Sequence, residues 1–429
     1  MKWLDLQNKT VGIWGMGREG LAVVQAVNRF VPSATVLSFD DNNLTVLNNC
    51  DIVITSPGVS LYRPEIQQAQ KQGIIFTTGT DLFLHNKSEQ TKVIGVTGTK
   101  GKSTTSSLLY HTLVQCGFTV KLAGNIGIPL IEMLFDEPDI VVAELSSYQC
   151  AGLTKGCDIA VLLNLYPEHL QWHLSHHNYY QDKCKLIQLS EQAVINGSNE
   201  TILSELINVQ NLHQFNTFNT IHLEKGLFFD NDTALFAIDL LNLKGEHNAL
   251  NACAVLTVLK LLNQNITDKV IQSAFQTMNA LPHRLQNVGT FNGLTFIDDS
   301  ISTTPESAIA ALKAYDDGGY LTLLVGGYDR GQIYEPLIDY VRTLKNRILF
   351  ITLPDTGTRI AQMAEQADIR AYSANSMQEA VRIAQQQTPM GGKVILSPAA
   401  PSYNLYQNFE ERGKDFENCI QKTRKNNLN

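Results

Sequence analysis

A glycine-rich turn behind an apolar run carries the side chains in this sequence that are best suited to bind phosphate. Gly98 and Gly101 permit backbone angles that bring several N–H groups toward one anion, and a helix starting near Ser103 adds its positive end. Lys102 supplies charge to the outer phosphates, and the Ser103 hydroxyl is placed to bind magnesium. The strict pattern G-x-x-x-x-G-K-[ST] is not met, because Val96 replaces its first glycine. The stretch predicts an ATP-dependent enzyme with an atypical phosphate loop.

A second glycine-rich turn, Gly15–Gly20, has the full G-x-G-x-x-G pattern between an apolar strand at 10–14 and a helical run. The next predicted strand, 35–39, ends in Asp40 and Asp41, the spacing at which a dinucleotide fold places an acid on ribose. Taken alone, the pattern predicts an NAD site, so an NAD-dependent oxidoreductase is the competing hypothesis. The same geometry holds any nucleotide diphosphate, and glycines that serve only helix packing are a further alternative.

Two more candidate groups, Glu144 and His169, follow apolar runs of the parallel-sheet type. The carboxyl end of a strand beside the phosphate-loop strand is where a metal-bound nucleotide needs an oxygen ligand, and Glu144 fits that position. Three nearby histidines show no zinc-ligand spacing with a further partner. We therefore predict that His173, His176 and His177 are helix and surface residues.

Apolar runs alternate with helical patterns along the chain and predict an α/β fold of three domains. Residues 1–88 fit a Rossmann-like domain. Residues 89–282 fit a central P-loop ATPase-type domain with a parallel or mixed sheet, and residues 283–429 fit a second Rossmann-like domain. Residues 190–240 are polar and strand-like in short pieces, and no chemistry follows from them.

Composition narrows the class of protein further. The 429 residues are 44% hydrophobic and 17% charged, as expected for a globular protein of several domains. A net charge of −8 offers no broad basic face, so we expect no nucleic-acid partner. The seven cysteines lack C-x-x-C pairing and no apolar run could span a membrane, so we expect reduced thiols, a cytoplasmic location and no membrane partner. We also expect a monomer.

Taken together, the motifs resemble those of the Mur ligases of peptidoglycan synthesis. The matching pieces follow the order of that family along the chain: Gly98–Thr104, Glu144–Ser147, Glu168–His169, Gly245–Asn251, Pro282–Arg284, Asp298–Ser300 and Ser397–Ser402. The first domain and the ending 402–413 resemble the glutamate-adding branch, whereas the diaminopimelate-selecting D-N-P-R motif of another branch is absent. Folylpolyglutamate synthetases are a less favoured alternative, because that related family lacks the first domain.

The resemblance implies an ATP-dependent amide ligase. ATP would phosphorylate the alanyl carboxylate of UDP-N-acetylmuramoyl-L-alanine to an acyl phosphate, and the amino group of D-glutamate would then attack it. The cofactors implied are ATP and two magnesium ions, one of them bound through a carbamate on a lysine. The resemblance also assigns the G-x-G-x-x-G turn to UDP rather than to NAD.

The resemblance assigns individual residues to five roles. The residues expected at the UDP-sugar are Met16, Arg18, Asp40, Asp41, Ser56, Gly58 and Asn125. Those expected at ATP are Gly98, Thr99, Lys100, Gly101, Lys102, Ser103, Thr104, Asn248, Arg284 and Asp299. Those expected at glutamate are Thr303, Arg330, Ser402, Tyr403 and Phe409. The implied metal ligands are Ser103, Glu144, His169 and the carbamate of Lys183. The implied catalytic residues are Lys102, His169, Lys183 and Arg284.

Several residues depart from the family's pattern. Ile301 stands where the family's Asp-Ser-Lys-Ala-Thr-Asn motif has a cation, Arg330 replaces a lysine, and Tyr403 replaces a smaller residue. Lys100 stands where asparagine is usual. Because most of these changes fall on the amino-acid pocket, L-glutamate, which a variant branch uses, is the alternative substrate. By its sequence pattern alone, Lys183 would be an ordinary lysine on a helix surface.

Overall fold

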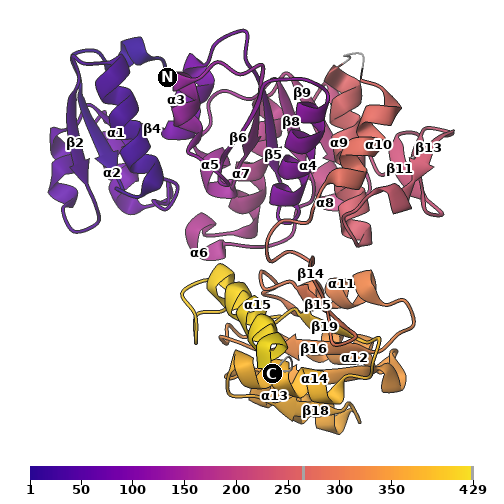
Figure 1. Ribbon diagram of the computed structural model, residues 1–429. Helices are drawn as coiled ribbons and strands as arrows, with labels where there is room; N and C mark the ends of the chain where they lie inside the picture. The colour runs from indigo at the N-terminus through magenta and orange to yellow at the C-terminus, as the bar shows by residue number, and fades with distance from the viewer. Residues whose placement is uncertain (263–265, 427–429) are drawn as a thin grey trace. The chain divides into compact units, whose positions relative to one another are not determined.

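The computed structural model describes residues 1–262 and 266–426, which form two compact units (Figure 1). Unit 1 comprises residues 1–241 and 247–278, and unit 2 comprises residues 242–246 and the chain from 279 onward. Strands and helices alternate in both units, which confirms the predicted α/β class. Within the described part of the chain, no helix combines the length and the apolar character needed to cross a membrane.

The first sheet of unit 1 is parallel, with the strand order β2-β1-β3-β4. Its strands are β1 (Thr10–Trp14), β2 (Thr35–Phe39), β3 (Ile52–Thr55) and β4 (Ile75–Thr78). The helices and 3-10 turns of this part are η1 (Trp3–Leu6), α1 (Arg18–Phe30), η2 (Leu44–Asn49), α2 (Pro64–Lys71) and α3 (Gly79–Asn86). The glycine pattern after β1 is a packing requirement, because a Cβ on Gly20 would lie 2.0 Å from the carbonyl oxygen of Gly15.

The central sheet of unit 1 has the strand order β13-β12-β11-β10-β9-β8-β5-β7-β6. Its strands are β5 (Lys92–Thr97), β6 (Val120–Gly124), β7 (Ile140–Glu144), β8 (Ile159–Leu162), β9 (Gln192–Asn196), β10 (Leu212–Phe215), β11 (Ile221–Glu224), β12 (Leu227–Asp230) and β13 (Thr233–Ala237). Strands β5 to β11 pair in parallel, whereas β12 and β13 pair antiparallel. The polar stretch 190–240 therefore builds one edge of this sheet.

Helices and 3-10 turns surround the central sheet, whose middle strands are almost wholly buried. They are α4 (Lys102–Gln115), η3 (Leu130–Phe135), α5 (Ser147–Ala151), α6 (Leu170–His173), α7 (His176–Leu189), α8 (Glu200–Glu205), η4 (Ile238–Leu240), α9 (Glu246–Leu262) and α10 (Asp268–Thr277). Because β5 lies between β7 and β8, the loops that follow these three strands meet at one edge.

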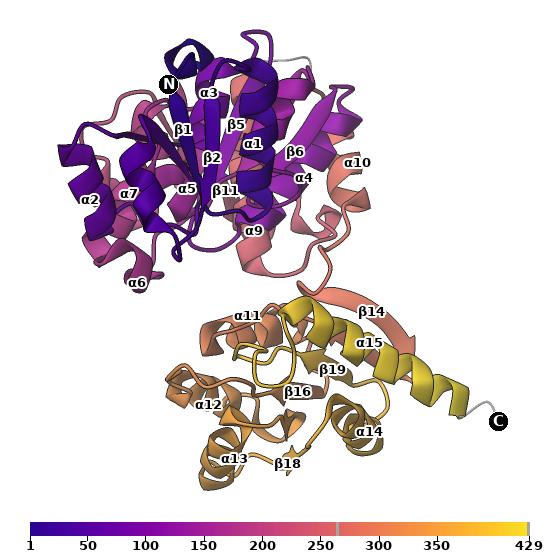
Figure 2. The ribbon, with the colours of Figure 1, turned by 90° about the vertical axis from the view of Figure 1, so that its left-hand side faces the viewer.

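Unit 2 contains a mixed sheet with the strand order β14-β15-β19-β16-β17-β18. Its strands are β14 (Gln286–Phe291), β15 (Leu294–Asp298), β16 (Leu321–Val325), β17 (Ile348–Thr352), β18 (Ala371–Ser373) and β19 (Lys393–Leu396). Its helices and 3-10 turn are α11 (Pro305–Tyr315), α12 (Glu335–Arg342), η5 (Lys345–Arg347), α13 (Thr356–Gln366), α14 (Met377–Gln387) and α15 (Phe409–Asn426). Helix α15 packs on α14 and beside β14 and β15 (Figure 2). The three sheets occupy separate stretches of sequence, and the domain boundaries near 88 and 282 stay a prediction.

Candidate active site

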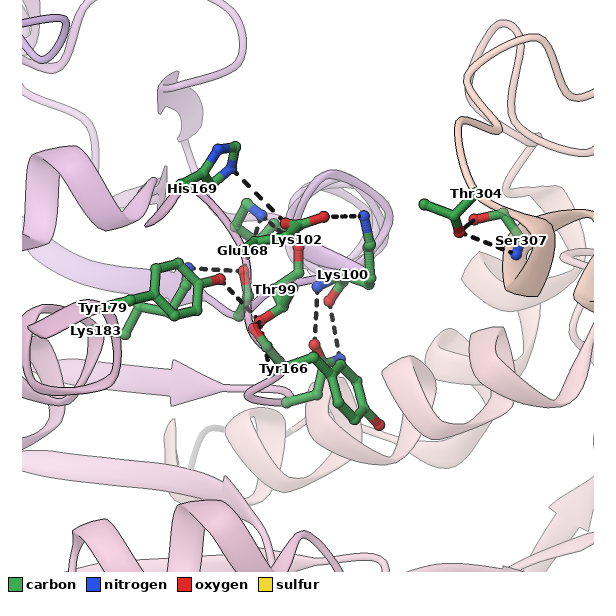
Figure 3. Close-up of polar contacts among 12 residues, drawn as sticks. Thr99, Lys100, Lys102, Tyr166, Glu168, His169, Tyr179, Lys183, Thr304 and Ser307 are labelled. Atoms are coloured by element: carbon green, nitrogen blue, oxygen red, sulfur yellow. Dashed lines mark hydrogen bonds and ion pairs between the residues drawn. The ribbon is translucent and has the colours of Figure 1, made fainter. Parts of the chain in front are cut away.

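The phosphate loop follows β5 and has the backbone geometry that its glycines predict. Gly98 and Gly101 have φ angles of 153° and 88°, values that side chains rarely permit. Helix α4 begins at Lys102, whose Nζ donates to the carbonyl oxygens of Gly98 (2.8 Å) and Thr99 (3.0 Å) (Figure 3). A Cβ on Gly101 would lie 2.6 Å from the Oδ1 of Asn251, so the start of α9 lies against this loop.

The loop is held by the segment that follows β8. The backbone N–H of Thr99 donates to the carbonyl oxygen of Asn164 (3.0 Å), and the N–H of Lys100 donates to the Asn164 Oδ1 (2.8 Å). The buried Thr99 hydroxyl also pairs with the Tyr179 hydroxyl of α7 at 2.9 Å. On α9, Asn251 donates to the Oδ1 of Asn248, the residue expected at ATP. The loop is therefore shaped before any nucleotide binds.

Glu144 ends β7 and is buried, with 1% of its surface exposed. Asn125 donates its Nδ2 to the Glu144 Oε1 at 2.7 Å, while the Oε2 has no hydrogen-bond partner among the described residues. Burial of a carboxylate oxygen without a partner is costly. A cation at this oxygen would remove that cost, so the donor set fits magnesium.

Lys183 on α7 is 1% exposed, so the pattern-based prediction of a surface lysine is wrong. Its Nζ donates to the carbonyl oxygen of Gly98 (2.9 Å) and to the Thr97 Oγ1 (3.3 Å), which brings it to the phosphate loop (Figure 3). Burial, together with the charge of Lys102, lowers the pKa of Lys183 to about 7. The amine is thus present in part as the uncharged form near neutral pH.

His169 precedes α6 with a left-handed φ of 55° and leaves about half of its side chain exposed. Burial lowers its pKa, against the opposing effect of the neighbouring Glu168 carboxylate. Glu168 also forms an ion pair with Lys100, which ties this segment to the phosphate loop (Figure 3). The Tyr179 ring lies near both His169 and Lys183, with its centre 6.4 Å from that of the His169 ring and 5.3 Å from the Lys183 Nζ.

The prediction that the other three histidines are surface residues is correct for two of them and wrong for the third. His176 and His177 are exposed on the first turn of α7, as predicted. His173 is fully buried, so its prediction as a surface residue is wrong. Its Nδ1 pairs with the Asp182 Oδ2 at 2.7 Å and its Nε2 with the Ser147 Oγ at 2.9 Å, and these two partners offset the cost of burial.

A cavity of about 560 Å³ lies beside the first glycine-rich turn of unit 1. Most residues expected at the UDP-sugar line it: Arg18, Asp40, Asp41, Ser56, Gly58 and Asn125. Met16 belongs to the same turn and is 37% exposed, but it is not among the lining residues. Glu19, Tyr148 and Gln149 also line the cavity, and sequence reasoning missed them. Glu19 occupies a variable position of G-x-G-x-x-G, so the motif gave no signal for it.

In unit 2, the residues expected at the nucleotide lie just before β14 and just after β15, which pair in antiparallel fashion. Asp299 follows β15, accepts from the Ser397 Oγ (2.7 Å) and from the N–H of Leu285 (3.2 Å), and is buried. Burial raises the pKa of Asp299 to about 7 against those hydrogen bonds. Arg284 precedes Leu285 in the same turn, whose shape is fixed by the pair between His283 Nδ1 and Asp298 Oδ2 at 2.6 Å.

The residues expected at glutamate lie on several loops of unit 2 and at the start of α15. The Arg330 guanidinium lies 5.2 Å from the centre of the exposed Tyr403 ring. Thr303 lies between β15 and α11, Ser402 is buried, and the backbone carbonyl of Phe409 accepts from the Ser300 Oγ at 2.8 Å. Sequence reasoning missed one further residue here. Arg412 is buried and donates to the carbonyl oxygens of Ser300 and Ala400, so it holds two of these loops together.

Comparison with known proteins gives matches over both units. The Mur ligase middle domain matches residues 96–259, and the Mur ligase, glutamate ligase domain matches residues 283–400. A UDP-N-acetylmuramoyl-L-alanine–L-glutamate ligase of Salinispora tropica is 36% identical over 99% of this chain and 100% of its own length. A protein of the same name from Xanthomonas euvesicatoria pv. vesicatoria is 34% identical over 97% of this chain and 96% of its own length.

Among solved structures, the UDP-N-acetylmuramate-alanine ligase MurC of Thermotoga maritima has a similar fold. The TM-score is 0.62 at 17% sequence identity, and the match covers 97% of this chain and 100% of that one. This similarity extends over both units and concerns the fold alone.

Proposed function

Because the chain belongs to the Mur ligase family, we propose that it is the ATP-dependent ligase that joins glutamate to UDP-N-acetylmuramoyl-L-alanine in peptidoglycan precursor synthesis. The observation that carries the proposal is the carboxyl edge of the central sheet, where the phosphate loop, Glu144 and Lys183 meet. The names of the relatives support the two substrates. The competing oxidoreductase hypothesis offers no function for the residues at this edge of the sheet.

The proposed reaction has two steps. An oxygen of the alanyl carboxylate attacks the γ-phosphorus of ATP, and ADP leaves with the electron pair of the broken P–O bond. The uncharged amino group of glutamate then attacks the acyl carbon, and phosphate leaves as the amide forms and a proton is lost. The Lys102 Nζ folds back onto the loop, where it is positioned to offset the charge of the transferred phosphoryl group, and the same role is proposed for Arg284.

Magnesium is part of the proposal because the Glu144 Oε2, which has no hydrogen-bond partner within residues 1–262 and 266–426, suits a hard cation. The residues that would hold two ions are Ser103, Glu144, His169 and Lys183 as a carbamate. Bound magnesium would neutralise phosphate charge during transfer. The buried position of Lys183 supports the carbamate, since an uncharged amine can add to carbon dioxide with loss of one proton.

We propose L-glutamate as the amino-acid substrate. The family resemblance implied D-glutamate, with L-glutamate as the alternative, and the names of the two relatives favour the alternative. The Arg330–Tyr403 pair supports a pocket that differs from the family's usual one, because a guanidinium held on an aromatic ring presents a planar donor in place of a lysine.

One assay tests both levels of the proposal. The protein is incubated with UDP-N-acetylmuramoyl-L-alanine, Mg-ATP and either L- or D-glutamate, and phosphate release and the amide product are measured in parallel. We expect product with L-glutamate and little with D-glutamate. Product with D-glutamate alone would reject the choice of enantiomer, and no product with either would reject the ligase proposal.

A further inference from the structure

Glu19 is an acidic residue in a position that suits an anionic ligand. It lies in the first turn of α1, directly after the glycine-rich turn, and lines the 560 Å³ cavity. Backbone N–H groups at the start of such a helix attract phosphate. An ionised carboxylate in the same place would repel it.

The carboxyl group of Glu19 is held by a neighbouring amide whose orientation is fixed. Gln149 is 2% exposed, and its Oε1 accepts from both the backbone N–H and the hydroxyl of Ser146 at 3.0 Å. The opposite end of the same amide, the Nε2, donates to the Glu19 Oε1 at 2.7 Å. Glu19 is thus fixed at the cavity wall, between α1 and α5.

Other charged side chains also lie around the cavity. Its described lining includes the carboxylates of Asp40 and Asp41 as well as the guanidinium of Arg18. Asp41 is paired with Arg63 at 2.8 Å, and Arg18 donates to the carbonyl oxygen of Gly127 at 2.7 Å. The diphosphate of a UDP-sugar adds two negative charges, so a third carboxylate beside it would raise the electrostatic cost of binding.

Burial of Glu19 favours its uncharged form, which would not repel a phosphate. It raises the pKa of Glu19 to about 7, against the smaller opposing effects of the Gln149 hydrogen bond and the Arg18 charge. Burial also raises the pKa of Tyr148, another residue of the cavity lining, so that phenol carries no charge near neutral pH. Protonation of Glu19 near neutral pH is therefore accessible.

We propose that Glu19 meets the diphosphate of the UDP-linked substrate as a neutral carboxylic acid and donates its O–H to a phosphate oxygen. The inference rests on the proposed function, because it takes this cavity as the UDP-sugar site. Binding then requires a proton on Glu19, so affinity is full at low pH and declines as pH rises. Once the free protein has lost that proton, affinity falls by about tenfold per pH unit.

Calorimetric titration of the whole protein with UDP-N-acetylmuramoyl-L-alanine tests this between about pH 6 and about pH 8.5. The diphosphate diester does not titrate in this range, unlike the terminal phosphate of free UDP. We expect the wild-type dissociation constant to rise by about tenfold or more over the range. Glu19→Gln keeps a neutral donor, so its dissociation constant should stay constant and at about pH 8.5 should be about tenfold below that of the wild type.

Two controls make the result specific. Glu137→Gln removes an exposed carboxylate far along the chain from Glu19 and should keep the wild-type pH dependence of binding. Uridine, which lacks phosphate, should bind the wild type and Glu19→Gln with equal affinity. Titration of the wild type in buffers of different ionisation enthalpy should show uptake of about one proton per ligand at about pH 8. Tight binding that is flat with pH, or a parallel decline in Glu19→Gln, would overturn this inference alone. No binding at about pH 6 would overturn the UDP-sugar site itself.

Discussion

Unit 1 contains two glycine-rich loops that share a backbone plan and differ in charge. Each follows a buried parallel strand and opens a helix, β1 into α1 and β5 into α4. Each depends on glycines with positive φ, Gly15 at 94° in the first loop and Gly101 at 88° in the second. By geometry alone, both are anion sites.

The two loops differ in the charge of the side chains around them. The second loop collects lysines, with Lys102 and Lys183 both donating to the carbonyl oxygen of Gly98. The first loop faces acids, since Glu19, Asp40 and Asp41 line its cavity. A lysine-rich loop beside a buried carboxylate suits a triphosphate with a metal ion, whereas an acidic cavity suits a ligand with hydroxyl groups and a smaller charge. The backbone thus determines that an anion can bind, and the side chains determine which one.

The strongest test of this comparison exchanges the cation of each loop for an uncharged side chain of similar length. Lys102→Met should reduce turnover on the order of a thousandfold or more, because the transferred phosphoryl group loses its charge partner. Arg18→Met should instead weaken binding of the UDP-sugar and leave kcat almost unchanged. Phosphate release and calorimetric titration distinguish the two effects. Near-normal turnover of Lys102→Met would remove the proposed difference between the loops.

Substitution of Lys183 should give the next largest loss of activity. Lys183→Ala should lower kcat by about a hundredfold or more, because a proposed metal ligand is lost. Formate or acetate in the assay should restore part of the activity by taking the place of the carbamate. Lys185→Ala is the matched control two residues further along α7, since the Lys185 Nζ donates to the carbonyl oxygen of Ala151 instead. Failure of rescue, with the folded protein confirmed by circular dichroism, would count against the carbamate.

The first loop offers a test of its backbone. Gly20→Ala should destabilise unit 1 by about 3 kcal/mol, because the new Cβ would lie 2.0 Å from the carbonyl oxygen of Gly15. Gly17→Ala, three residues earlier, should change stability by less than about 0.5 kcal/mol. Apart from its two chain neighbours, no described residue has an atom within 4 Å of the new Cβ, and the φ of Gly17 is −71°. Urea unfolding measures both variants. Equal shifts of the two midpoints would show that this packing is not what holds the loop.

Sequence reasoning was most successful where the signal is local. Continuous apolar runs predicted the parallel strands, and the predicted strand at 35–39 coincides with β2. The start of α4 at Lys102 lies one residue from its prediction near Ser103. Glycine spacing predicted both anion loops, because positive φ angles and close backbone approach are properties of single positions.

The buried polar groups could not be predicted in this way. Lys183 and His173 belong to helical stretches whose pattern permits exposure, and their hydrogen-bond networks include residues far away in the chain. Thr97 is 86 residues from Lys183, and Tyr62, which donates to the Asp182 partner of His173, is 120 residues from Asp182. A polar side chain is buried when such distant partners satisfy it, and helical periodicity carries no information about them.

The smallest expected effect concerns Lys100, a departure from the family's pattern in the second loop. Its side chain forms an ion pair with Glu168 while 51% exposed, and exposed pairs contribute about 1 kcal/mol or less. The contacts that shape the loop belong to its backbone, which exchanges hydrogen bonds with the Asn164 side chain at 2.8 and 3.0 Å. Lys100→Asn should therefore change kcat by no more than about threefold, whereas Asn164→Ala should cost about tenfold or more. If steady-state assays ranked the two variants the other way, charge at Lys100 rather than loop shape would be what distinguishes this loop from the first.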